Sequence, residues 1–343
     1  MFSKKILGAC VLSAMFVISG CHKNEQNSRQ KVEDTAQLDL KLDTDNMMTH
    51  LRAFEEIAQR HGGNRAVGTQ GGTASADYIS NLAKQAGYHV ELQSFENREK
   101  TRGQNLIVEI PGDSKDNVII LGAHYDSVKM GPGINDNASG VALLLELMNQ
   151  LSSQKIKFKP TIYLVFWDSE EIGIAGSQDY VSKLTAEQLK SVKAYINLDM
   201  VGTKNPEIMI ADGDKSSLDE MVQMLKEQGM PEQDYKPLID GLRNIPGHAG
   251  DLALENTLKE FFKAKNIKIK EDVTTLTASD TAPFLGKVPV TSLILFNEQM
   301  KGDELEFAPC YHKACDTIEQ VDPKSMQLAG DAVIHLLHTL TQS

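Results

Sequence analysis

The stretch LGAHYDSVKMGPGINDNASG, at positions 121–140, constrains the fold of this chain more than any other part. It continues an apolar run from Val118 to Leu121 that is typical of a buried strand, and polar residues begin where that run ends. In open α/β sheets, functional sites lie at the carboxyl ends of the strands. The stretch therefore predicts an α/β sheet with a site at this strand end. A turn with solvated polar residues is the alternative for this stretch taken alone.

Three polar residues of this stretch suit a metal site. His124 and Asp126 are two positions apart, so in a strand they point the same way, and Asp126 can hold the imidazole that His124 offers to a metal ion. The Gly-Pro-Gly sequence at 131–133 bends the chain and allows Asp136 to return to the same place.

Acidic residues also follow two later apolar segments. Glu170 and Glu171 come soon after the predicted strand 161–167, and Asp199 directly follows the predicted strand 194–198. Taken singly, paired glutamates often occupy a helix N-terminus, and an aspartate often caps a turn. Three strand ends that all carry metal-ligand side chains form a more specific pattern, and they predict one shared site.

A late segment of the chain adds Tyr311 and His312 to this set, although either residue alone could belong to the core. Imidazole and carboxylate both suit zinc, and the combined set is large enough for two zinc ions that share one carboxylate. One glutamate would then remain free to accept a proton from a metal-bound water molecule. The residues therefore predict a two-zinc hydrolase.

The rest of the chain alternates helical and strand patterns, and its apolar strands indicate burial on both faces. We predict a three-layer α/β sandwich, in which a mixed, mostly parallel central sheet is flanked by helices. The predicted strands are 90–95, 106–110, 118–123, 161–167, 194–198 and 290–296. The predicted helices are 45–61, 75–86, 138–151, 173–184, 218–227, 252–263 and 323–340.

The segment from about 203 to 278 is longer than a minimal strand–helix–strand connection. Its part from Pro231 to Gly250 is rich in proline, glycine and polar residues, and we expect it to lack regular structure. Because the segment leaves the sheet just after Asp199, we expect it either to fold over the rim of the site as a lid or to lie on the surface away from the site.

The N-terminus has the features of a lipoprotein precursor. Residues 1–20 have the charge, apolar run and small residues of a signal peptide, and the Ile-Ser-Gly before Cys21 resembles a bacterial lipobox. Cys21 would then carry lipid and anchor the protein outside the cytoplasm, with ordinary secretory cleavage as the alternative. The residue after the lipidated cysteine is His22 rather than aspartate, and by resemblance to the usual lipoprotein sorting rule this favours the outer membrane. We expect residues 21–44 to form a flexible tether and residues 45–343 a catalytic domain.

Two cysteines, Cys310 and Cys315, remain for the mature domain. In an oxidising compartment, two thiols at this spacing predict a local disulfide around Tyr311 and His312. The formal net charge is −12 and no dense cluster of lysine and arginine occurs, which argues against binding to nucleic acid. We expect the chain to act as a monomer.

The chain resembles the co-catalytic di-zinc aminopeptidases secreted by bacteria, of the aminopeptidase S and leucyl aminopeptidase type. The resemblance runs from about residue 46 to the C-terminus. It rests on seven motifs in family order: HGGNRAVGT at 61–69, GAHYDS at 122–127, GPGINDN at 131–137, EEIG at 170–173, NLDMVG at 197–202, SD at 279–280 and CYHKACD at 310–316. At one point the chain departs from the pattern, because Thr281 follows Asp280 where many relatives have histidine or tyrosine.

The resemblance implies two zinc ions with ligands from separate segments. His124 and Asp199 would bind one ion, and Glu171 and His312 would bind the other. Asp136 would bridge the two ions.

The resemblance also implies the roles of nearby groups. Glu170 would be the general base and would return its proton to the leaving amine. Tyr311 would donate a hydrogen bond to the oxyanion of the tetrahedral intermediate, and Asp126 would support His124. The implied reaction is the removal of N-terminal residues from peptides with free N-termini.

Glutaminyl cyclases and glutamate carboxypeptidases are related to these aminopeptidases and remain alternatives. A carboxypeptidase needs arginines to hold a substrate carboxylate, and only Arg243 lies in the long downstream segment. A cyclase uses one zinc ion, whereas nothing in this sequence indicates the loss of a zinc site. An inactive lipoprotein that keeps the fold as a binding module is disfavoured, because Glu170 and all five ligand positions are intact.

Overall fold

The computed structural model describes residues 40–301 and 304–342 of the chain. The predicted signal peptide, the predicted lipidation site Cys21 and the first part of the predicted tether lie outside the described residues. Leu40 and Leu42, near the end of the predicted tether, are buried in the core with exposures of 7% and 0%. Packing therefore begins a few residues before position 45.

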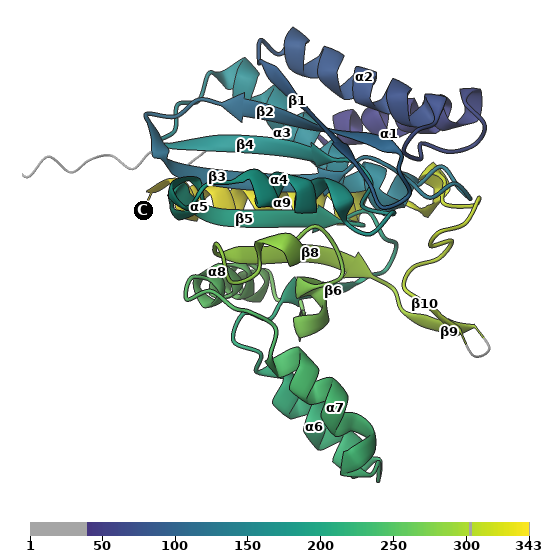
Figure 1. Cartoon of the computed structure of the whole chain (residues 1–343), viewed down its shortest axis with the longest axis vertical. Helices are drawn as coiled ribbons and strands as arrows, with labels where there is room; N and C mark the ends of the chain where they lie inside the picture. The colour runs from purple at the N-terminus through teal and green to yellow at the C-terminus, as the bar shows by residue number, and fades with distance from the viewer. Residues whose placement is uncertain (1–39, 302–303, 343) are drawn as a thin grey trace, which may run out of the picture. The chain divides into compact units, whose positions relative to one another are not determined.

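A mixed sheet of eight strands forms the centre of the described domain (Figure 1). In spatial order the strands are β1 (Val90–Glu96), β2 (Arg102–Ile110), β4 (Pro160–Trp167), β3 (Ser114–His124), β5 (Val192–Asp199), β8 (Val290–Phe296), β6 (Glu207–Ala211) and β7 (Lys270–Asp272). The central strands β4, β3, β5 and β8 are parallel to one another, whereas β2 and β6 pair antiparallel with the outer members of this group. The predicted α/β fold with a mixed sheet is confirmed.

Side chains alternate between the two faces of the sheet and form two apolar cores. On β3, Ile119 and Leu121 join the first core, whereas Val118 and Ile120 join the second. Figure 1 shows α9 behind the sheet, and α4 and α5 in front of it. The helices on the first core are α1 (Thr44–Arg60), α2 (Gln70–Gln85), α3 (Ser139–Gln154), α8 (Asp251–Ala264) and α9 (Pro323–Gln342). Those on the second are α4 (Ala175–Lys183), α5 (Ala186–Ser191), α6 (Ser217–Glu227) and α7 (Glu232–Arg243).

The segment after Pro231 was expected to lack regular structure, and that prediction is wrong because it contains α7. This helix forms because Tyr235 and Ile239 lie one turn apart and are buried in the second core, with exposures of 5% and 3%. Their packing outweighs the unfavourable Pro237 inside the helix. In Figure 1, α6 and α7 lie side by side and extend away from the sheet, which favours a surface excursion over a lid.

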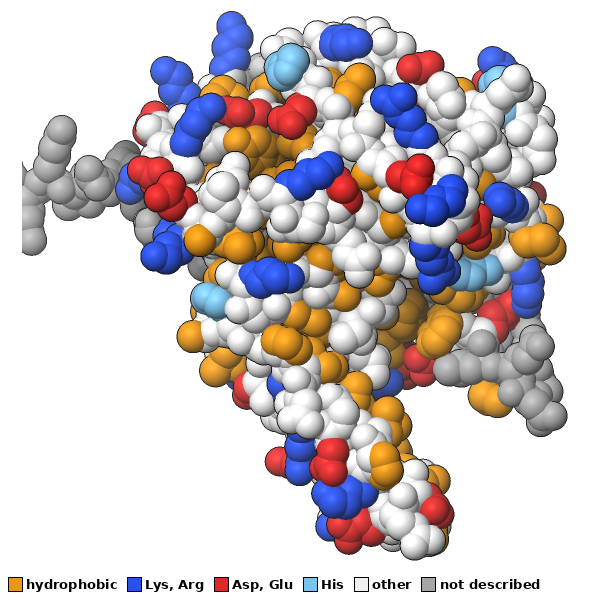
Figure 2. Space-filling view, in the orientation of Figure 1, with side chains coloured by type: hydrophobic (Ala, Val, Ile, Leu, Met, Phe, Trp, Pro, Cys, Tyr) orange, Lys and Arg blue, Asp and Glu red, His pale blue; other side chains and the backbone are white. Residues whose placement is uncertain are grey.

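The remaining elements are short. They are β9 (Gln299–Lys301), β10 (Glu304–Glu306), η1 (Ile134–Ala138), η2 (Val273–Leu276), η3 (Ala282–Phe284) and η4 (Ile318–Gln320). Among the helices of the described residues, none has the length and apolar character needed to cross a membrane. On the face shown in Figure 2, acidic and basic side chains are interspersed, and hydrophobic side chains are visible along the α6–α7 hairpin. Exposed residues of this hairpin include Met224, Met230 and Leu238.

Candidate metal centre

Three adjacent strands bring the predicted site residues to one edge of the sheet. β4, β3 and β5 are neighbours and run parallel, so their carboxyl ends lie together. His124 is the last residue of β3 and Asp199 is the last residue of β5, and both are buried. Glu170 and Glu171 follow β4 in a turn where Ser169 has a positive φ of 61°.

Asp136 lies between two histidines. Its Oδ1 is 3.3 Å from Nε2 of His124, and its Oδ2 is 3.2 Å from Nε2 of His312. Each imidazole also has a second carboxylate beside it. Oδ1 of Asp199 lies 3.5 Å from Nε2 of His124, and Oε2 of Glu171 lies 3.1 Å from Nε2 of His312. The five side chains therefore form two groups that share Asp136.

The loop that carries His312 comes from a distant part of the chain and is closed by a disulfide. Cys310 and Cys315 are bonded, which confirms the predicted disulfide. Cys310 and His312 have positive φ values of 66° and 56°, a backbone conformation that few residues other than glycine adopt. This loop packs closely on the loop that carries Asp136, because a Cβ added to Gly131 would lie 2.1 Å from the carbonyl oxygen of Lys313.

Two glutamates of this centre have raised pKa values. Burial is the main cause that raises the pKa of Glu171 to about 7, and the charge of Asp136 adds to the effect. Burial also raises the pKa of Glu170 well above its usual range. Buried oxygens of Asp126, Glu171 and Asp199 accept no hydrogen bond from the described residues. Cations between these side chains would remove this cost, and the mixture of imidazole and carboxylate fits zinc.

The two histidines show where positive charge is favoured. Burial alone would lower the pKa of His312, but its hydrogen bonds with Asp136 and Glu171 raise that pKa to about 10. Burial also acts to lower the pKa of His124, yet Asp199 and the other carboxylates around it raise that pKa well above its usual range. The space beside each Nε2 therefore favours a cation.

Asp126 connects His124 to the turn of Glu170. Its Oδ1 lies 3.5 Å from Nδ1 of His124, whereas Asp136 approaches the other ring nitrogen. The same oxygen accepts a hydrogen bond of 3.1 Å from the backbone N–H of Glu170. One carboxylate thus helps to orient the imidazole and to position Glu170.

Tyr311 lies beside the centre and stacks on His312, with ring centroids 3.8 Å apart. Burial, with a further contribution from the nearby carboxylates, raises the pKa of the Tyr311 hydroxyl well above its usual range. The hydroxyl therefore stays protonated at neutral pH and can act as a hydrogen-bond donor. The ring also packs against a small apolar cluster of Met200, Ile294 and Ala308.

Three buried charged residues around the centre are not among the site residues predicted from the sequence: Arg65, Asp280 and Asp316. Asp280 accepts a hydrogen bond of 2.5 Å from Ser177, its other oxygen accepts none from the described residues, and burial raises its pKa to about 7. Arg65 and Asp316 form hydrogen bonds with the loop that carries Asp136. Each of the three lies inside a quoted motif, but no local pattern distinguishes it from an ordinary surface charge.

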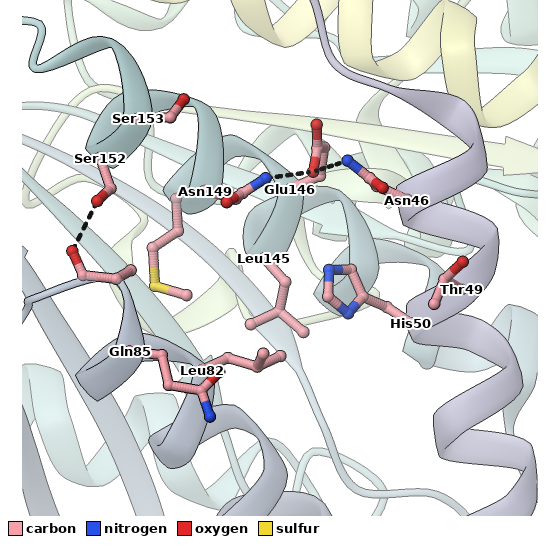
Figure 3. A pocket seen from close by; sticks show the side chains of 12 residues that line it. Asn46, Thr49, His50, Leu82, Gln85, Leu145, Glu146, Asn149, Ser152 and Ser153 are labelled. Carbon is pink, nitrogen blue, oxygen red and sulfur yellow. Dashed lines mark hydrogen bonds between the residues drawn. The ribbon is translucent and has the colours of Figure 1, made fainter.

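A cavity of about 330 Å³ lies between α1, α2 and α3, and none of the predicted site residues lines it (Figure 3). Its polar groups bond to one another and to the backbone. Glu146 accepts hydrogen bonds from Nδ2 of Asn46 and of Asn149, and Ser152 donates to the carbonyl oxygen of Ala86. This cavity is therefore distinct from the candidate metal centre.

Comparison with known proteins finds sequence relatives that cover most of this chain. Residues 105–337 match the model of Peptidase family M28. The chain is 30% identical over 308 residues to Leupeptin-inactivating enzyme 1 of Streptomyces exfoliatus, with 86% of this chain and 61% of that protein covered. It is 29% identical over 295 residues to the probable lipoprotein aminopeptidase LpqL of Mycobacterium tuberculosis, with 79% and 55% covered. The chain thus spans somewhat more than half the length of these two relatives.

Solved structures share the fold at lower sequence identity. A zinc aminopeptidase of Bacillus subtilis, BSAP, superposes with a TM-score of 0.65 at 18% identity, covering 88% of this chain and 95% of that one. A glutaminyl cyclase of Bacteroides thetaiotaomicron superposes with a TM-score of 0.63, also at 18% identity, covering 87% and 98%. The fold alone therefore does not distinguish an aminopeptidase from a cyclase.

Proposed function

Because this chain belongs to peptidase family M28, we propose that it is a zinc-dependent aminopeptidase that hydrolyses N-terminal residues from peptides. The observation that carries this proposal is the position of Asp136, whose two oxygens face different histidines. A carboxylate shared between two metal ions is the usual basis of a two-metal hydrolase.

Two zinc ions fit the donor set of the centre. His124 and Asp199 would hold one ion together with Oδ1 of Asp136. Glu171 and His312 would hold the other together with Oδ2 of Asp136. When bound, the ions would lower the pKa of a water molecule and polarise the scissile carbonyl group.

The charge of the centre supports bound cations. Asp136, Glu171 and Asp199 face histidine nitrogens at the centre, and negative charges in a buried site are costly without cations beside them.

Glu170 is the carboxylate best placed to move protons. Its backbone is held by Asp126, and none of the five proposed ligand contacts uses its side chain. A carboxylate that is not a metal ligand is free to accept a proton from water. Glu170 would then deliver this proton to the leaving amine, which completes the hydrolysis without a second acid.

Tyr311 would stabilise the oxyanion that forms as water adds to the peptide carbonyl. Its ring stacks on His312 beside the centre, and its hydroxyl stays protonated at neutral pH. A single well-placed donor of this kind contributes about 3 kcal/mol to catalysis in comparable sites.

Metal analysis combined with a substrate panel tests this proposal. The zinc-loaded protein is expected to contain two zinc ions per chain, to release the chromophore from an aminoacyl p-nitroanilide and to leave the N-acetylated analogue intact. Cyclisation of an N-terminal glutaminyl peptide without hydrolysis would identify a cyclase. Release of C-terminal residues would identify a carboxypeptidase, and zinc binding without turnover would indicate an inactive binding protein.

We also propose that the protein is a lipoprotein outside the cytoplasm, anchored through Cys21, with a monomeric catalytic domain that begins near Leu40 and acts on peptides. The lipobox-like sequence before Cys21 supports this location. The name of the LpqL relative, a probable lipoprotein aminopeptidase, agrees with it. We propose the outer membrane as its location because the residue after Cys21 is His22 rather than aspartate.

A further inference from the structure

The Asp136 loop, residues 125–138 between β3 and α3, is largely buried, and its backbone joins a strand where the N–H of Tyr125 donates to the carbonyl oxygen of Trp167 on β4 at 2.8 Å. Its other buried polar groups need partners from elsewhere. Arg65, in the connection between α1 and α2, supplies them on one side. Its Nε donates to the carbonyl oxygen of Pro132 at 2.7 Å, and its Nη2 donates to that of Gly133 at 2.5 Å. Its Nη1 donates to the carbonyl oxygen of Tyr125 at the other end of the loop. One guanidinium group therefore joins both ends of this loop.

Arg65 is itself held rigidly. Its side chain has an exposure of 0%, and its guanidinium carbon lies 5.2 Å from the centre of the Phe54 ring. Its backbone N–H donates to Oγ of Ser127 at 2.9 Å, and that hydroxyl donates to the carbonyl oxygen of Gly131 at 3.0 Å. Every donor of Arg65 in these contacts is directed at the same loop.

Asp316 holds the part of the loop that lies in η1. Its Oδ1 accepts a hydrogen bond of 2.9 Å from the backbone N–H of Asn135, and its Oδ2 accepts one of 3.1 Å from the N–H of Asp136. Its carbonyl oxygen accepts a further hydrogen bond of 3.1 Å from the N–H of Ile134. Because Asp316 directly follows Cys315, it belongs to the segment that carries His312. A single residue thus connects the segments of two proposed ligands.

Arg65 also carries a positive charge close to the carboxylates of the centre. Burial lowers the pKa of Arg65 to about 10, and nearby carboxylates oppose this effect, so the group stays cationic at neutral pH. These carboxylates are Asp126, Asp316, Asp136 and Glu171. A fixed positive charge therefore lies among the acids, although its hydrogen bonds go to carbonyl oxygens rather than to carboxylates.

We propose that Arg65 and Asp316 are positioning residues that fix the Asp136 loop against the His312 segment and thereby set the affinity of the centre for zinc. This inference rests on the proposed function, because it assumes that Asp136 and His312 bind metal. Both residues act through the loop backbone, so their replacement displaces the oxygens of Asp136 and leaves all five ligands present.

Two conservative variants test the proposal. Asp316→Asn preserves the size of the side chain but turns an NH₂ group toward one of the two backbone N–H groups. Arg65→Lys preserves the charge but cannot reach three carbonyl oxygens. Asp251→Asn is the matched control, because Asp251 is also buried, with an exposure of 2%, and its two oxygens accept the backbone N–H groups of His248 and Val290, at 2.7 and 2.8 Å.

The measurements are the dissociation constant for Zn²⁺, from competition with a chelator, and the absorption spectrum of the Co²⁺-substituted protein. Loss of a residue that orients a metal ligand typically weakens metal binding about 10- to 100-fold, and we expect this change in both variants. Their Co²⁺ spectra should change, and their kcat should largely recover at saturating metal. The Asp251→Asn control should match the parent in zinc affinity and in spectrum.

Three results would overturn the proposal. If the parent binds zinc tightly and both variants bind it equally well, the positioning role fails while the proposed function stands. If both variants fail to fold even in excess zinc, Arg65 and Asp316 are needed for folding rather than for metal affinity. If the parent itself binds no zinc, the proposed function fails together with this inference.

Discussion

Glu170 and Glu171 are adjacent in sequence, but their side chains have different surroundings. Oε2 of Glu171 lies 3.1 Å from Nε2 of His312, whereas the contact described for Glu170 uses its backbone N–H. Glu170→Ala should therefore keep both zinc ions while kcat falls by about 10²- to 10⁴-fold, the usual cost of losing a general base. Zinc content by mass spectrometry and steady-state kinetics check this expectation.

Two neighbouring substitutions serve as controls for Glu170→Ala. Glu171→Ala should lose the ion beside His312, and Asp136→Ala should lose both ions because it removes the shared ligand. If Glu170→Ala lost zinc but kept a normal rate for each remaining zinc ion, the roles assigned to the two glutamates would be reversed.

His50 provides a residue-scale prediction away from the centre. Burial lowers its pKa from 6.5 to about 4, and its Nδ1 lies 2.8 Å from the hydroxyl of Tyr78. Because the folded state has the lower pKa, this contribution to stability is present above pH 6.5 and is lost as the pH falls from 6.5 to about 4. The loss amounts to at most about 3 kcal/mol.

Urea unfolding of the parent and of His50→Gln, from pH 7.5 to pH 4, measures this effect. The parent should lose more stability on acidification than the variant, because the variant has no imidazole to protonate. Both proteins retain every proposed metal ligand, so acid effects at the centre cancel in the comparison. Parallel pH profiles of the two proteins would contradict the prediction.

At the level of elements, the disulfide segment around Tyr311 and His312 is expected to act locally. Replacing Cys310 and Cys315 with serine removes a cross-link that closes a very short loop. A disulfide across so short a loop stabilises a protein by only about 2 kcal/mol. The positive φ values in this loop then lose their covalent support. We expect weaker zinc binding at His312 and a reduced kcat, with a small decrease in the free energy of unfolding.

Zinc titration and chemical denaturation of the double serine variant separate these two effects. The free energy of unfolding could instead fall by several kcal/mol while the zinc affinity stays at the parent value. That result would show that the disulfide stabilises the whole domain rather than the His312 loop. Addition of a phosphine reductant to the parent should reproduce the variant, because it breaks the same bond without adding a thiol that competes for zinc.

The α6–α7 hairpin gives a second element-scale prediction. Ile239 anchors α7 in the second core with an exposure of 3%. Ile239→Ala should lower the stability of this region by about 2–5 kcal/mol and should expose the turn between α6 and α7 to proteases. Because the hairpin extends away from the sheet in Figure 1, zinc content and KM should stay at the parent values.

Peptides of different lengths show whether the hairpin limits access to the centre. Leu238→Ala is a suitable control, because Leu238 lies beside Ile239 but is 59% exposed and should contribute little to stability. A KM for long peptides that changes in Ile239→Ala, with zinc retained, would revive the lid hypothesis.

At the scale of the whole molecule, the location of the protein depends on residues outside the described structure. Cys21→Ser should convert a membrane-bound protein into a soluble or unprocessed form, because lipid attachment needs the thiol. Membrane fractionation together with mass analysis of the N-terminus checks this outcome. An unchanged distribution between membrane and soluble fractions would argue against the lipobox.

The sequence by itself was sufficient to predict the central strands and the candidate residues at their ends. This succeeded because burial on both faces of a parallel sheet produces continuous apolar runs, and the residue that ends such a run is visible without any tertiary information. His124 and Asp199 each end a strand of this kind. The Cys310–Cys315 disulfide could be predicted for the same reason, since it joins residues that are close in sequence.

Only the tertiary structure revealed the partners that hold these residues in place. α7 forms through packing on a distant core, which outweighs the proline and glycine of its own sequence. The two oxygens of Asp136 face different histidines because Arg65 and Asp316 hold its loop, and these two residues are far apart in the sequence. Contacts over such separations leave no periodic pattern in the chain, because they depend on how segments pack rather than on which residues are neighbours.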